Sequence, residues 1–508
     1  MKGPVPPVPR SRRLLLTEVL DGTEMEVTDQ TVVNETDIIG LTCDSRQVEP
    51  GFIFAALPGN QLDGRDFIPD ALVQGAACVL APEGTEMPGD VRDIWTGEPI
   101  PMLRHANPRR QFALMASAFY ETQPDLIAAI TGTNGKTSVA AFLSQIWTGL
   151  GRKAASAGTL GILARGFENR NSLTTPDSVD LHRHLRDLAR CGGDRLALSA
   201  SSPRLDPHRL DGVKVSVAGF TNLTHDHLDY HGTMDGYLTA KLRLFTDILA
   251  ADGTAVINAD ADIAPSVEAA CRERGLKIMT YGEGGADVRL DGVETTADGY
   301  NLEITAAGKT ARVMLPLIGG FQVSNALAAL ALAVASGEDA EDAMGLLEGL
   351  KGASGRVQLV DRHPSGAGIF VDYAHTPDAL KNILESLRPH TDGRLNVVFG
   401  CGGDRDTGKR PEMGAIAAAH ADGVIVTADN PRTEDPAAIR AEIMAAVPEA
   451  KEIGDRGEAI AEAVNNLEAG DTLVIAGKGH EKGQIIGEEK RPFDDVQVAR
   501  DSLRRLRS

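Results

Sequence analysis

The chain has 508 residues, a length that suggests about three domains of roughly 150 residues each. Hydrophobic residues make up 42% and charged residues 24% of the chain, which predicts packed cores and excludes global disorder. With 72 acidic and 51 basic residues the net charge is −21, so we expect neither a nucleic acid nor an anionic membrane as the main ligand. The longest apolar run, "NALAALALAVASG", is too short to span a bilayer, so we expect no membrane insertion.

The N-terminal region, which we place at residues 1–107, contains a polar tail followed by short strand-like runs. The first dozen residues are rich in Pro and Arg, as in a frayed terminus. The stretch "SRRLLLTEVLDG" faintly resembles a twin-arginine signal, but Glu18 and Asp21 interrupt its apolar part. The five cysteines are scattered and include no CxxC, which fits a reducing compartment. We therefore expect a cytoplasmic protein with strands at "GFIFAAL" and "AACVLAP".

A phosphate-binding turn opens the second region, which we place at residues 108–353. In "ITGTNGKTSV" (130–139) the turn joins the strand "DLIAAI" to a helix that Gly149 and Gly151 end. Its backbone N–H groups can hold an anion, Lys136 can neutralise phosphate charge and the Thr137 hydroxyl can ligate Mg²⁺. The loop is shorter than the usual phosphate loop, which has Gly where this chain has Ile130. A plain glycine turn is the alternative.

A stretch rich in His and Asp follows at residues 222–245, "NLTHDHLDYHGTMDGYLTAKLRLF". It approaches the H-x-H-x-D-H pattern of binuclear metallohydrolases, but Tyr230 interrupts that pattern. Two other interpretations are open. One is a solvated turn, and the other places one or two of these histidines near Mg²⁺–ATP, before a helix that carries Lys241 toward the site.

The third region, residues 354–508, alternates strands with Ala- and Glu-rich helices, which predicts a mostly parallel sheet. Ligands of such sheets bind at the carboxyl ends of the strands. Four strands run into loops rich in polar residues: "FVDYAHTPDAL", "FGCGGDRDTGKRPEMG", "TADNPRTEDP" and "AGKGHEKGQ". Arg405, Lys409 and Arg432 could bind carboxylates or phosphates there. Each loop alone is typical of a solvated turn, but four at one sheet edge predict a site.

The motifs together resemble a known family. "TGTNGKTS", "NLTHDHLDYHGTM…AK", "IGGFQVSNALAALA", "GRVQLV", "VDYAHTPDAL", "FGCGGDRDTGKRPEMG" and "AGKGHE" are similar, in the same order, to the Mur ligases of peptidoglycan synthesis, above all to their MurE branch. The likeness runs from about Thr42 to about Asp495. It implies an α/β protein of three domains: an N-terminal UDP-binding domain, a central P-loop ATPase domain and a C-terminal Rossmann-like domain.

The resemblance also implies a reaction. ATP phosphorylates a carboxylate, and the amine of an amino acid attacks the acyl phosphate, with Mg²⁺ at the phosphates. The substrates would be UDP-N-acetylmuramoyl-L-alanyl-D-glutamate and meso-diaminopimelate, and we expect a monomeric enzyme. A lysine-adding relative or a folylpolyglutamate synthase is an alternative, against which "DNPR" and the UDP-type N-terminal region argue. A catalytically impaired nucleotide-binding relative is a second alternative.

The family's functional residues map onto this sequence by motif. Lys136, His227 and Lys241 would be catalytic, with Thr137, His227 and a CO₂-derived carbamate on Lys241 as ligands of Mg²⁺. ATP would contact Gly132, Thr133, Asn134, Gly135, Lys136, Thr137, Ser138, Asn325 at the adenine, Arg356 and Asp372. The UDP-linked substrate would contact Ser45, Thr174, Thr175, Ser201 and Arg209. Diaminopimelate would contact Arg405, Asp429, Asn430, Pro431, Arg432, Gly477 and Glu481.

One patch departs from the family. This chain reads "LSASSPRLDPHRLDG" (198–212) where the family has roughly "LEASSHGLDQHRLDG". Ser199 replaces a Glu that would ligate Mg²⁺, Pro203 and Arg204 replace His-Gly, and Pro207 replaces a Gln. A hydroxyl brings no formal charge to the metal, which predicts weaker metal–ATP binding. Three explanations are open: an inactive relative, compensation by another carboxylate, or short frame slips in the recorded gene sequence.

Overall fold

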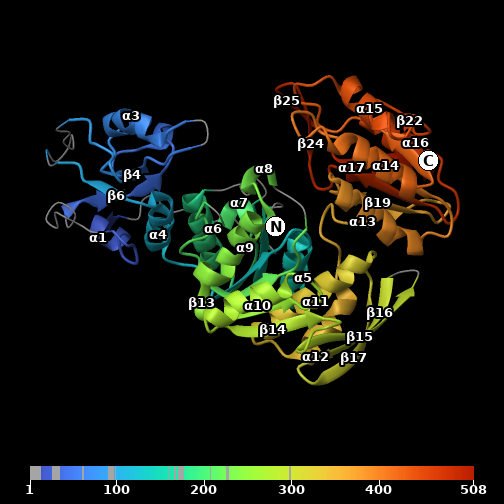
Figure 1. The fold of residues 1–508 in the computed structure, drawn as a ribbon, viewed down its shortest axis with the longest axis horizontal. Helices are drawn as coiled ribbons and strands as arrows, with labels where there is room; N and C mark the ends of the chain where they lie inside the picture. The colour runs from blue at the N-terminus through green and yellow to red at the C-terminus, as the bar shows by residue number, and fades with distance from the viewer. Residues whose placement is uncertain are drawn as a thin grey trace. The chain divides into compact units, whose positions relative to one another are not determined.

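The structure is a computed structural model that describes residues 13–25, 35–59, 62–89, 97, 99–158, 161–164, 167–169, 177–205, 207–224, 228–296 and 299–507 (Figure 1). Contacts within the chain form two compact units. The first contains Met1–Thr133, Arg152–Ala255 and Pro265–Ile278, and the second contains Asn134–Gly151, Val256–Ala264 and Met279–Ser508. The domain boundaries predicted near residues 107 and 353 divide the chain differently and stay predictions. The predicted frayed tail lies outside the described residues.

A four-stranded parallel sheet occupies the N-terminal part of the first unit, in the order β3 (Gly40–Thr42), β4 (Phe52–Ala55), β5 (Cys78–Pro82) and β6 (Met102–His105). Residues of β4 alternate between its faces, as the two-residue period of a strand requires. Ile53 packs on the side of α1 (Leu16–Val19) and α4 (Pro108–Tyr120). Phe54 packs on the side of α3 (Ile68–Val73). Both strands predicted in this region are confirmed.

The largest sheet has eleven strands in the order β10-β9-β8-β11-β7-β12-β13-β14-β15-β16-β17. Three neighbouring strands in it run parallel: β11 (Arg195–Ser199), β7 (Leu126–Thr131) and β12 (Val215–Phe220). In this register Ser199 lies beside Ile130, and Phe220 lies beside Thr131. The carboxyl ends of the three strands therefore meet at one edge, where the predicted phosphate-binding turn begins. The other strands are β8 (Ala154–Gly158), β9 (Gly161–Ala164), β10 (Phe167–Asn169), β13 (Leu249–Asn258), β14 (Lys277–Gly282), β15 (Val288–Thr296), β16 (Gly299–Ala306) and β17 (Lys309–Leu315).

In the second unit two apolar helices pack together, α5 (Lys136–Gly149) and α11 (Gly320–Ala335). Small alanines on α11 allow close approach, and Trp147 of α5 is fully buried and donates from Nε1 to the Ser336 hydroxyl at 3.1 Å. Strands β15, β16 and β17 form an antiparallel meander in this unit (Figure 1). The sequence analysis had identified α5 as a helix but had not recognised the meander.

A second sheet forms the C-terminal part of the chain, in the order β18 (Gln358–Arg362), β19 (Gly368–Asp372), β23 (Thr472–Ala476), β20 (Leu395–Phe399), β21 (Gly423–Val426) and β22 (Lys451–Glu452). Only the pairing of β18 with β19 is antiparallel among its described pairs. Phe370 packs with helices α13 (Pro377–Leu387), α14 (Lys409–His420) and α15 (Pro436–Met444), while Ile369 packs with α16 (Arg456–Asn465) and α17 (Asp495–Arg507). The mostly parallel sheet predicted here is confirmed.

The remaining elements are short or connect these layers. They are β1 (Leu14–Leu15), β2 (Asp37–Ile38), η1 (Ser45–Gln47), η2 (Gly64–Phe67), α6 (Ser178–Arg190), α7 (Ser202–Leu205), α8 (Leu228–His231), α9 (Met234–Arg243), η3 (Leu244–Ile248), α10 (Ala264–Glu273), α12 (Ala340–Gly345), η4 (Leu346–Gly349), η5 (Arg388–His390), β24 (Gly483–Ile486) and β25 (Glu489–Pro492). No helix in the described ranges is long and apolar enough to cross a membrane.

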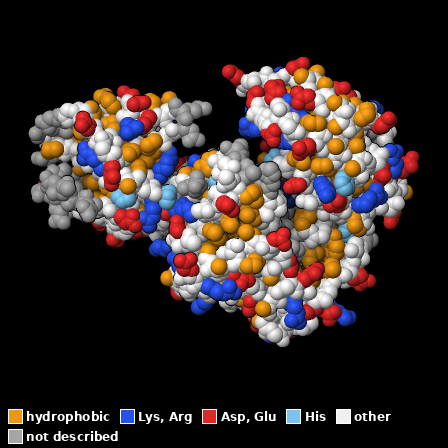
Figure 2. All heavy atoms as spheres, viewed as in Figure 1, with side chains coloured by type: hydrophobic (Ala, Val, Ile, Leu, Met, Phe, Trp, Pro, Cys, Tyr) orange, Lys and Arg blue, Asp and Glu red, His pale blue; other side chains and the backbone are white. Residues whose placement is uncertain are grey.

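Acidic and basic side chains are intermingled over the face drawn in Figure 2. Among the described residues on that face, the basic side chains form no continuous patch.

One ion pair in the C-terminal part is completely buried. Arg456 at the start of α16 donates from Nε and Nη2 to both oxygens of Asp495 at the start of α17, at 2.8 and 2.7 Å. Both side chains are 0% exposed. Because a buried charge is tolerated only when it is paired, this interaction determines how the two helices meet.

Replacement Asp495→Asn should therefore remove the two-pronged partner of the buried Arg456 charge, leaving only Asp429 at 3.9 Å, and lower the free energy of unfolding by about 3 kcal/mol. Urea unfolding of the full chain measures the loss. The matched control is Asp501→Asn on the same helix, because Asp501 pairs with Arg504 in solvent, and that change should cost no more than about 0.5 kcal/mol. Equal effects of the two variants would contradict the prediction.

Candidate active site

The predicted phosphate loop connects β7 to α5, and its backbone has the conformation that an anion-binding turn needs. Gly132 has φ 140° and Gly135 has φ 87°, values that favour glycine. A Cβ on Gly132 would also overlap the Thr221 hydroxyl. Helix α5 begins at Lys136, so the next N–H groups lie at a helix N-terminus, where an anion is favourable.

The start of this loop is held by the segment that precedes the His- and Asp-rich stretch. The Thr133 N–H donates to the Asn222 carbonyl at 2.9 Å, and its hydroxyl accepts from the Thr224 N–H at 3.0 Å. The Tyr237 hydroxyl of α9 donates to the same Thr133 oxygen at 3.3 Å. His227, for which a metal role was predicted, follows shortly after in the sequence but lies outside the described residues.

Lys241 reaches the phosphate loop from α9, as the sequence predicted for this helix. Its side chain is 1% exposed, and Nζ donates to the Gly132 carbonyl at 2.7 Å. The same nitrogen lies 4.2 Å from the centre of the Tyr237 ring, one helical turn earlier. A lysine is therefore buried beside the loop that would hold the phosphates.

Ser199 lies at the carboxyl end of β11 and is 3% exposed. Its neighbour in register is Ile130, two residues before Gly132, so the position is adjacent to the start of the phosphate loop. A hydroxyl here supplies an oxygen but no charge. Among the described residues, no group of three or more His, Cys, Asp or Glu side chains is placed to hold a metal ion.

The described residues predicted for the UDP-linked substrate, Ser45, Ser201 and Arg209, lie in the first unit. Arg209 is partly buried, and its Nη1 is enclosed without a hydrogen-bond partner among the described residues. Ser201 precedes α7, and Ser45 begins η1. Cys43, two residues before Ser45, donates to Asp177 at 3.6 Å, which draws the Ser45 turn toward the N-terminus of α6. Thr174 and Thr175 lie outside the described residues.

Two predicted ATP contacts, Arg356 and Asp372, meet around a strained backbone segment. Asp372 ends β19 and accepts from the Val357 and Ala374 N–H groups, both at 2.7 Å. Val357 has φ 45°, which is unfavourable for a β-branched residue, and the bond from Asp372 holds it there. Burial raises the pKa of Asp372, although the Arg356 charge opposes that rise. Arg356 lies over the Tyr373 ring at 4.6 Å, and burial lowers its pKa.

Asn325, the predicted adenine contact, lies on α11 and is 6% exposed. Its amide donates to the Gln322 side chain at 3.0 Å, one turn earlier on the helix. That bond determines which way the amide faces.

The four predicted loops of the C-terminal sheet are linked to one another. The Gly403 N–H donates to the Asn430 carbonyl at 2.9 Å, and Arg432 donates from Nη1 to the Gly403 carbonyl at 2.7 Å. Lys409 donates from Nζ to the His375 carbonyl at 2.9 Å. The structure thus confirms that these loops converge at one edge of the sheet.

A buried polar network holds Glu481 and Asn430. Lys478 is 0% exposed, and its Nζ donates to Asn430 Oδ1 at 3.0 Å and to Glu481 Oε2 at 3.1 Å. The Asn430 amide donates to the same Glu481 oxygen at 3.0 Å. Burial alone would raise the pKa of Glu481, but the hydrogen bond from Asn430 and the charge of Lys478 keep it below the usual value. Glu481 is therefore an anion at neutral pH.

The side chains of Asp429, Arg405 and His480 complete this edge. Asp429 lies 3.9 Å from Arg456 Nη1, and burial raises its pKa. Arg405 is exposed and donates to the Asp404 carbonyl at 3.0 Å. His480 packs 5.1 Å from the Tyr373 ring, and burial lowers its pKa to about 4, so its ring is neutral.

Sequence reasoning missed Lys478 and Arg456. Lys478 stands inside the quoted "AGKGHE" motif, and a lysine between two glycines at a strand end was a usable signal. Arg456 lies on a helix, and only the folded chain shows that it reaches Asp495 and the Ala476 carbonyl at 2.9 Å.

Comparison with known proteins agrees with this geometry. Three family models match: the Mur ligase family catalytic domain at residues 37–120, the Mur ligase middle domain at 130–333 and the Mur ligase glutamate ligase domain at 355–479. The UDP-N-acetylmuramoyl-L-alanyl-D-glutamate–2,6-diaminopimelate ligase of Caulobacter vibrioides is 51% identical over 472 residues, which cover 92% of this chain and 95% of that protein. The enzyme of the same name from Bradyrhizobium diazoefficiens is 49% identical over 475 residues, with coverage of 92% and 95%.

Comparison with solved structures also identifies Mur ligases. A structure of a UDP-N-acetylmuramoyl-L-alanyl-D-glutamate–2,6-diaminopimelate ligase matches with a TM-score of 0.72 and 34% identity, covering 98% of this chain and 100% of that one. MurF from Acinetobacter baumannii matches with a TM-score of 0.62 at 21% identity, covering 92% of this chain and 96% of that one, a likeness of fold alone. With its α/β three-domain architecture, its shortened phosphate loop and its matched domains, this chain belongs to the Mur ligase family.

Proposed function

We propose that this ATP-dependent amide ligase joins meso-diaminopimelate to UDP-N-acetylmuramoyl-L-alanyl-D-glutamate in peptidoglycan precursor synthesis. The relatives that share about half of its residues over nearly their whole length carry that name. The observation in the structure that supports the amino-acid specificity is the convergence of Arg432 and Glu481, with opposite charges, at one sheet edge. The second centre of diaminopimelate carries both a carboxylate and an ammonium, and these two side chains are suited to them.

In the proposed reaction the phosphate loop, with Lys136, binds the ATP phosphates. The substrate carboxylate attacks the γ-phosphorus, and ADP leaves. The diaminopimelate amine then attacks the acyl carbon, loses a proton and expels inorganic phosphate. Phosphorylation is needed because an unmodified carboxylate has no adequate leaving group. The loop N–H groups and Lys136 would stabilise the charge of the transferring phosphoryl group.

Mg²⁺ would neutralise phosphate charge in this site. The Thr137 hydroxyl, at the start of α5, and a carbamate on Lys241 are oxygen donors of the kind Mg²⁺ prefers. Carbamate formation needs the neutral amine to attack the carbon of CO₂ and release one proton, which turns a cationic side chain into an anionic one. His227 would be a further ligand. We expect the enzyme to act as a cytoplasmic monomer.

The first test is ligation by the purified protein. With ATP, Mg²⁺ and UDP-N-acetylmuramoyl-dipeptide, we expect amide formation with meso-diaminopimelate and little with L-lysine, and no ligation by Lys136→Ala.

Arg432→Lys should reduce kcat/KM for diaminopimelate roughly tenfold or more, because Lys cannot pair in two-pronged fashion, a loss of ~1–3 kcal/mol. The control is Arg440→Lys on α15, where the side chain pairs with Glu452 of β22, and it should leave that value unchanged. Efficient use of L-lysine by the unmodified protein would refute the specificity.

Lys241 provides a second prediction. Lys241→Ala should abolish ligation, and added short carboxylic acids should restore part of the rate by occupying the place of the carbamate at the metal. Incubation with ¹³C-bicarbonate should give a carbamate resonance in the ¹³C NMR spectrum that the variant lacks. An active Lys241→Ala enzyme, or a spectrum without such a signal at pH above 7, would rule out the carbamate.

Ser199 provides a third prediction. Its outcome also tests whether the chain is a catalytically impaired relative. Ser199→Glu would add an anionic oxygen ligand beside the phosphate loop, so the Mg²⁺ concentration for half-maximal rate should fall. Ser199→Gln is the matched control, since it adds the same bulk without the charge. If Glu and Gln behave alike, the position does not act on the metal. Resequencing the gene shows whether Ser199 is present at all.

A further inference from the structure

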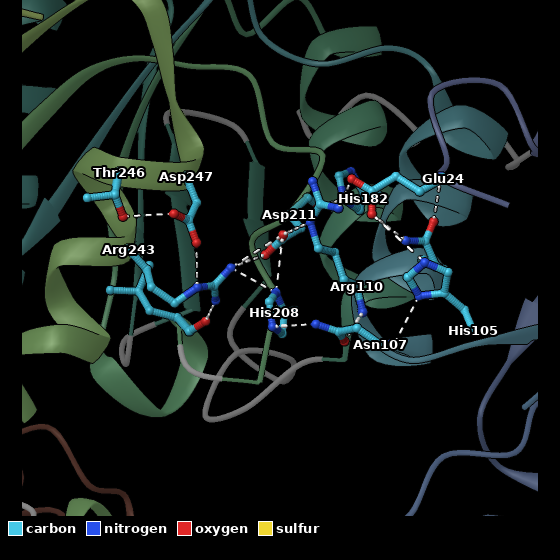
Figure 3. Close-up of polar contacts among 12 residues, drawn as sticks. Glu24, His105, Asn107, Arg110, His182, His208, Asp211, Arg243, Thr246 and Asp247 are labelled. Atoms are coloured by element: carbon cyan, nitrogen blue, oxygen red, sulfur yellow. Dashed lines mark hydrogen bonds and ion pairs between the residues drawn. The ribbon is translucent and has the colours of Figure 1, made fainter. Parts of the chain in front are cut away.

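A buried carboxylate, Asp211, follows Arg209 by two residues and lies at the centre of the polar contacts drawn in Figure 3. Asp211 is 6% exposed and accepts from Arg110 Nε at 3.1 Å and from Arg243 Nη2 at 3.1 Å. His208 Nδ1 lies 3.3 Å from the same carboxylate. Burial alone would raise the pKa of Asp211, but the bond from His208 and the charge of Arg243 hold it below its usual value. An ionised carboxylate therefore joins three side chains.

These partners come from different elements, so the network joins separate parts of the first unit. Arg110 belongs to α4, and Arg243 is the last residue of α9. The backbone carbonyl of Asp211 also accepts from Nε2 of buried His182 on α6, at 3.1 Å. Figure 3 shows these side chains converging on Asp211 from both sides. The end of the loop is thereby attached to three helices.

Arg243 holds the loop at further points. Its Nη1 donates to the Leu205 carbonyl, and its Nε donates to Asp247 at 2.9 Å, which keeps the guanidinium in one orientation. Lys241, two residues earlier on α9, donates to the phosphate loop. One helix thus contacts both the phosphate loop and the loop expected to bind the UDP-linked substrate.

His208, the residue before Arg209, has an unusual backbone conformation. Its φ is 58°, a left-handed conformation that is uncommon for residues other than Gly, although less so for His than for most, and that costs on the order of 1 kcal/mol. Asn107 caps α4 by accepting from the Arg110 N–H, so its amide faces His208 Nε2 as a donor, at 2.8 Å. At the other edge of the ring, Nδ1 lies 2.8 Å from Arg243 Nη2 and 3.3 Å from Asp211. The ring is held on both sides, and this holds the strained backbone.

Arg209 follows directly, with a partly enclosed guanidinium. Its Nη1 has no hydrogen-bond partner in the described part of the chain, as expected for a group that receives an anion. A guanidinium binds phosphate best when its fork is oriented in advance.

We propose that His208, Asp211 and Arg243 are positioning residues for the UDP-linked substrate, which hold Arg209 in the orientation that receives its anionic part. This inference rests on the proposed function for the identity of the ligand. None of the three side chains has to touch the substrate. Their effect is to remove the cost of ordering the loop at the time of binding.

The test measures binding and kinetics separately in the full-length protein. Calorimetry without ATP gives the Kd for UDP-N-acetylmuramoyl-L-alanyl-D-glutamate, and steady-state assays give kcat and the KM of each substrate. We expect Asp211→Asn and Arg243→Met to raise that Kd about tenfold, while the KM values for ATP and diaminopimelate change less than twofold. Arg243→Lys should recover part of the loss because it retains the charge.

Two further variants separate positioning from simple stabilisation. His208→Gly removes the ring but tolerates the positive φ, so it should fold as well as the parent and still bind the UDP-linked substrate more weakly. Arg274→Met is the control, because Arg274 binds the Phe245 and Leu249 carbonyls just after α9 and should affect stability alone. If His208→Gly binds normally, or if all KM values change together, the inference is wrong.

The same measurements distinguish a failure of the proposed function from a failure of the positioning inference. If the parent protein binds the UDP-linked substrate but ligates nothing, the function is wrong and the positioning inference is still decided by the Kd values. If the parent protein does not bind that substrate at all, both are overturned.

Discussion

The cost of burying charge is the constraint on which the loops of this protein depend. An ionised group removed from water is stable only with a partner of opposite charge or several hydrogen bonds. Lys478, Arg456 and Asp211 are all buried, and each bonds to groups from at least two segments. The loops at the carboxyl ends of the strands are therefore held in specific arrangements, although few of their residues are apolar.

The same principle explains how an acidic protein can bind anions. The net charge of −21 repels phosphates and carboxylates at a distance, and the positive groups that oppose it are local. The N-terminus of α5 is fixed by the helix itself, and Arg432 is placed by its bond to the Gly403 carbonyl. A guanidinium bonded on one side and open on the other can meet an anion without first ordering a flexible side chain.

Backbone strain is concentrated in the same loops. Six described residues other than Gly have positive φ, and four of them lie in loops with predicted substrate contacts: His208, Val357, Asp404 and Arg432. Val357, for example, is held by the buried bond from its N–H to Asp372. Strain of this kind persists only where surrounding contacts overdetermine the conformation, which is what an oriented binding site requires.

The sequence by itself determined the parallel sheets and the edge at which the chemistry lies. Apolar strands that lead into Gly-, Asp- and His-rich loops and then into amphipathic helices are local patterns, and parallel pairing places all such loops at one edge. The phosphate loop was recognisable for the same reason, because its glycines and Lys136 are adjacent in the chain. Only the tertiary structure decided that Arg456 meets Asp495, that Lys478 lies between Asn430 and Glu481, and that Asp211 joins α4 to α9. These partners are separated by up to 101 residues, as in the pair of Arg110 with Asp211, and no local pattern specifies which buried charges will meet. The antiparallel meander of β15, β16 and β17 was missed for a related reason, since its pairing depends on long-range packing as much as on residue preference.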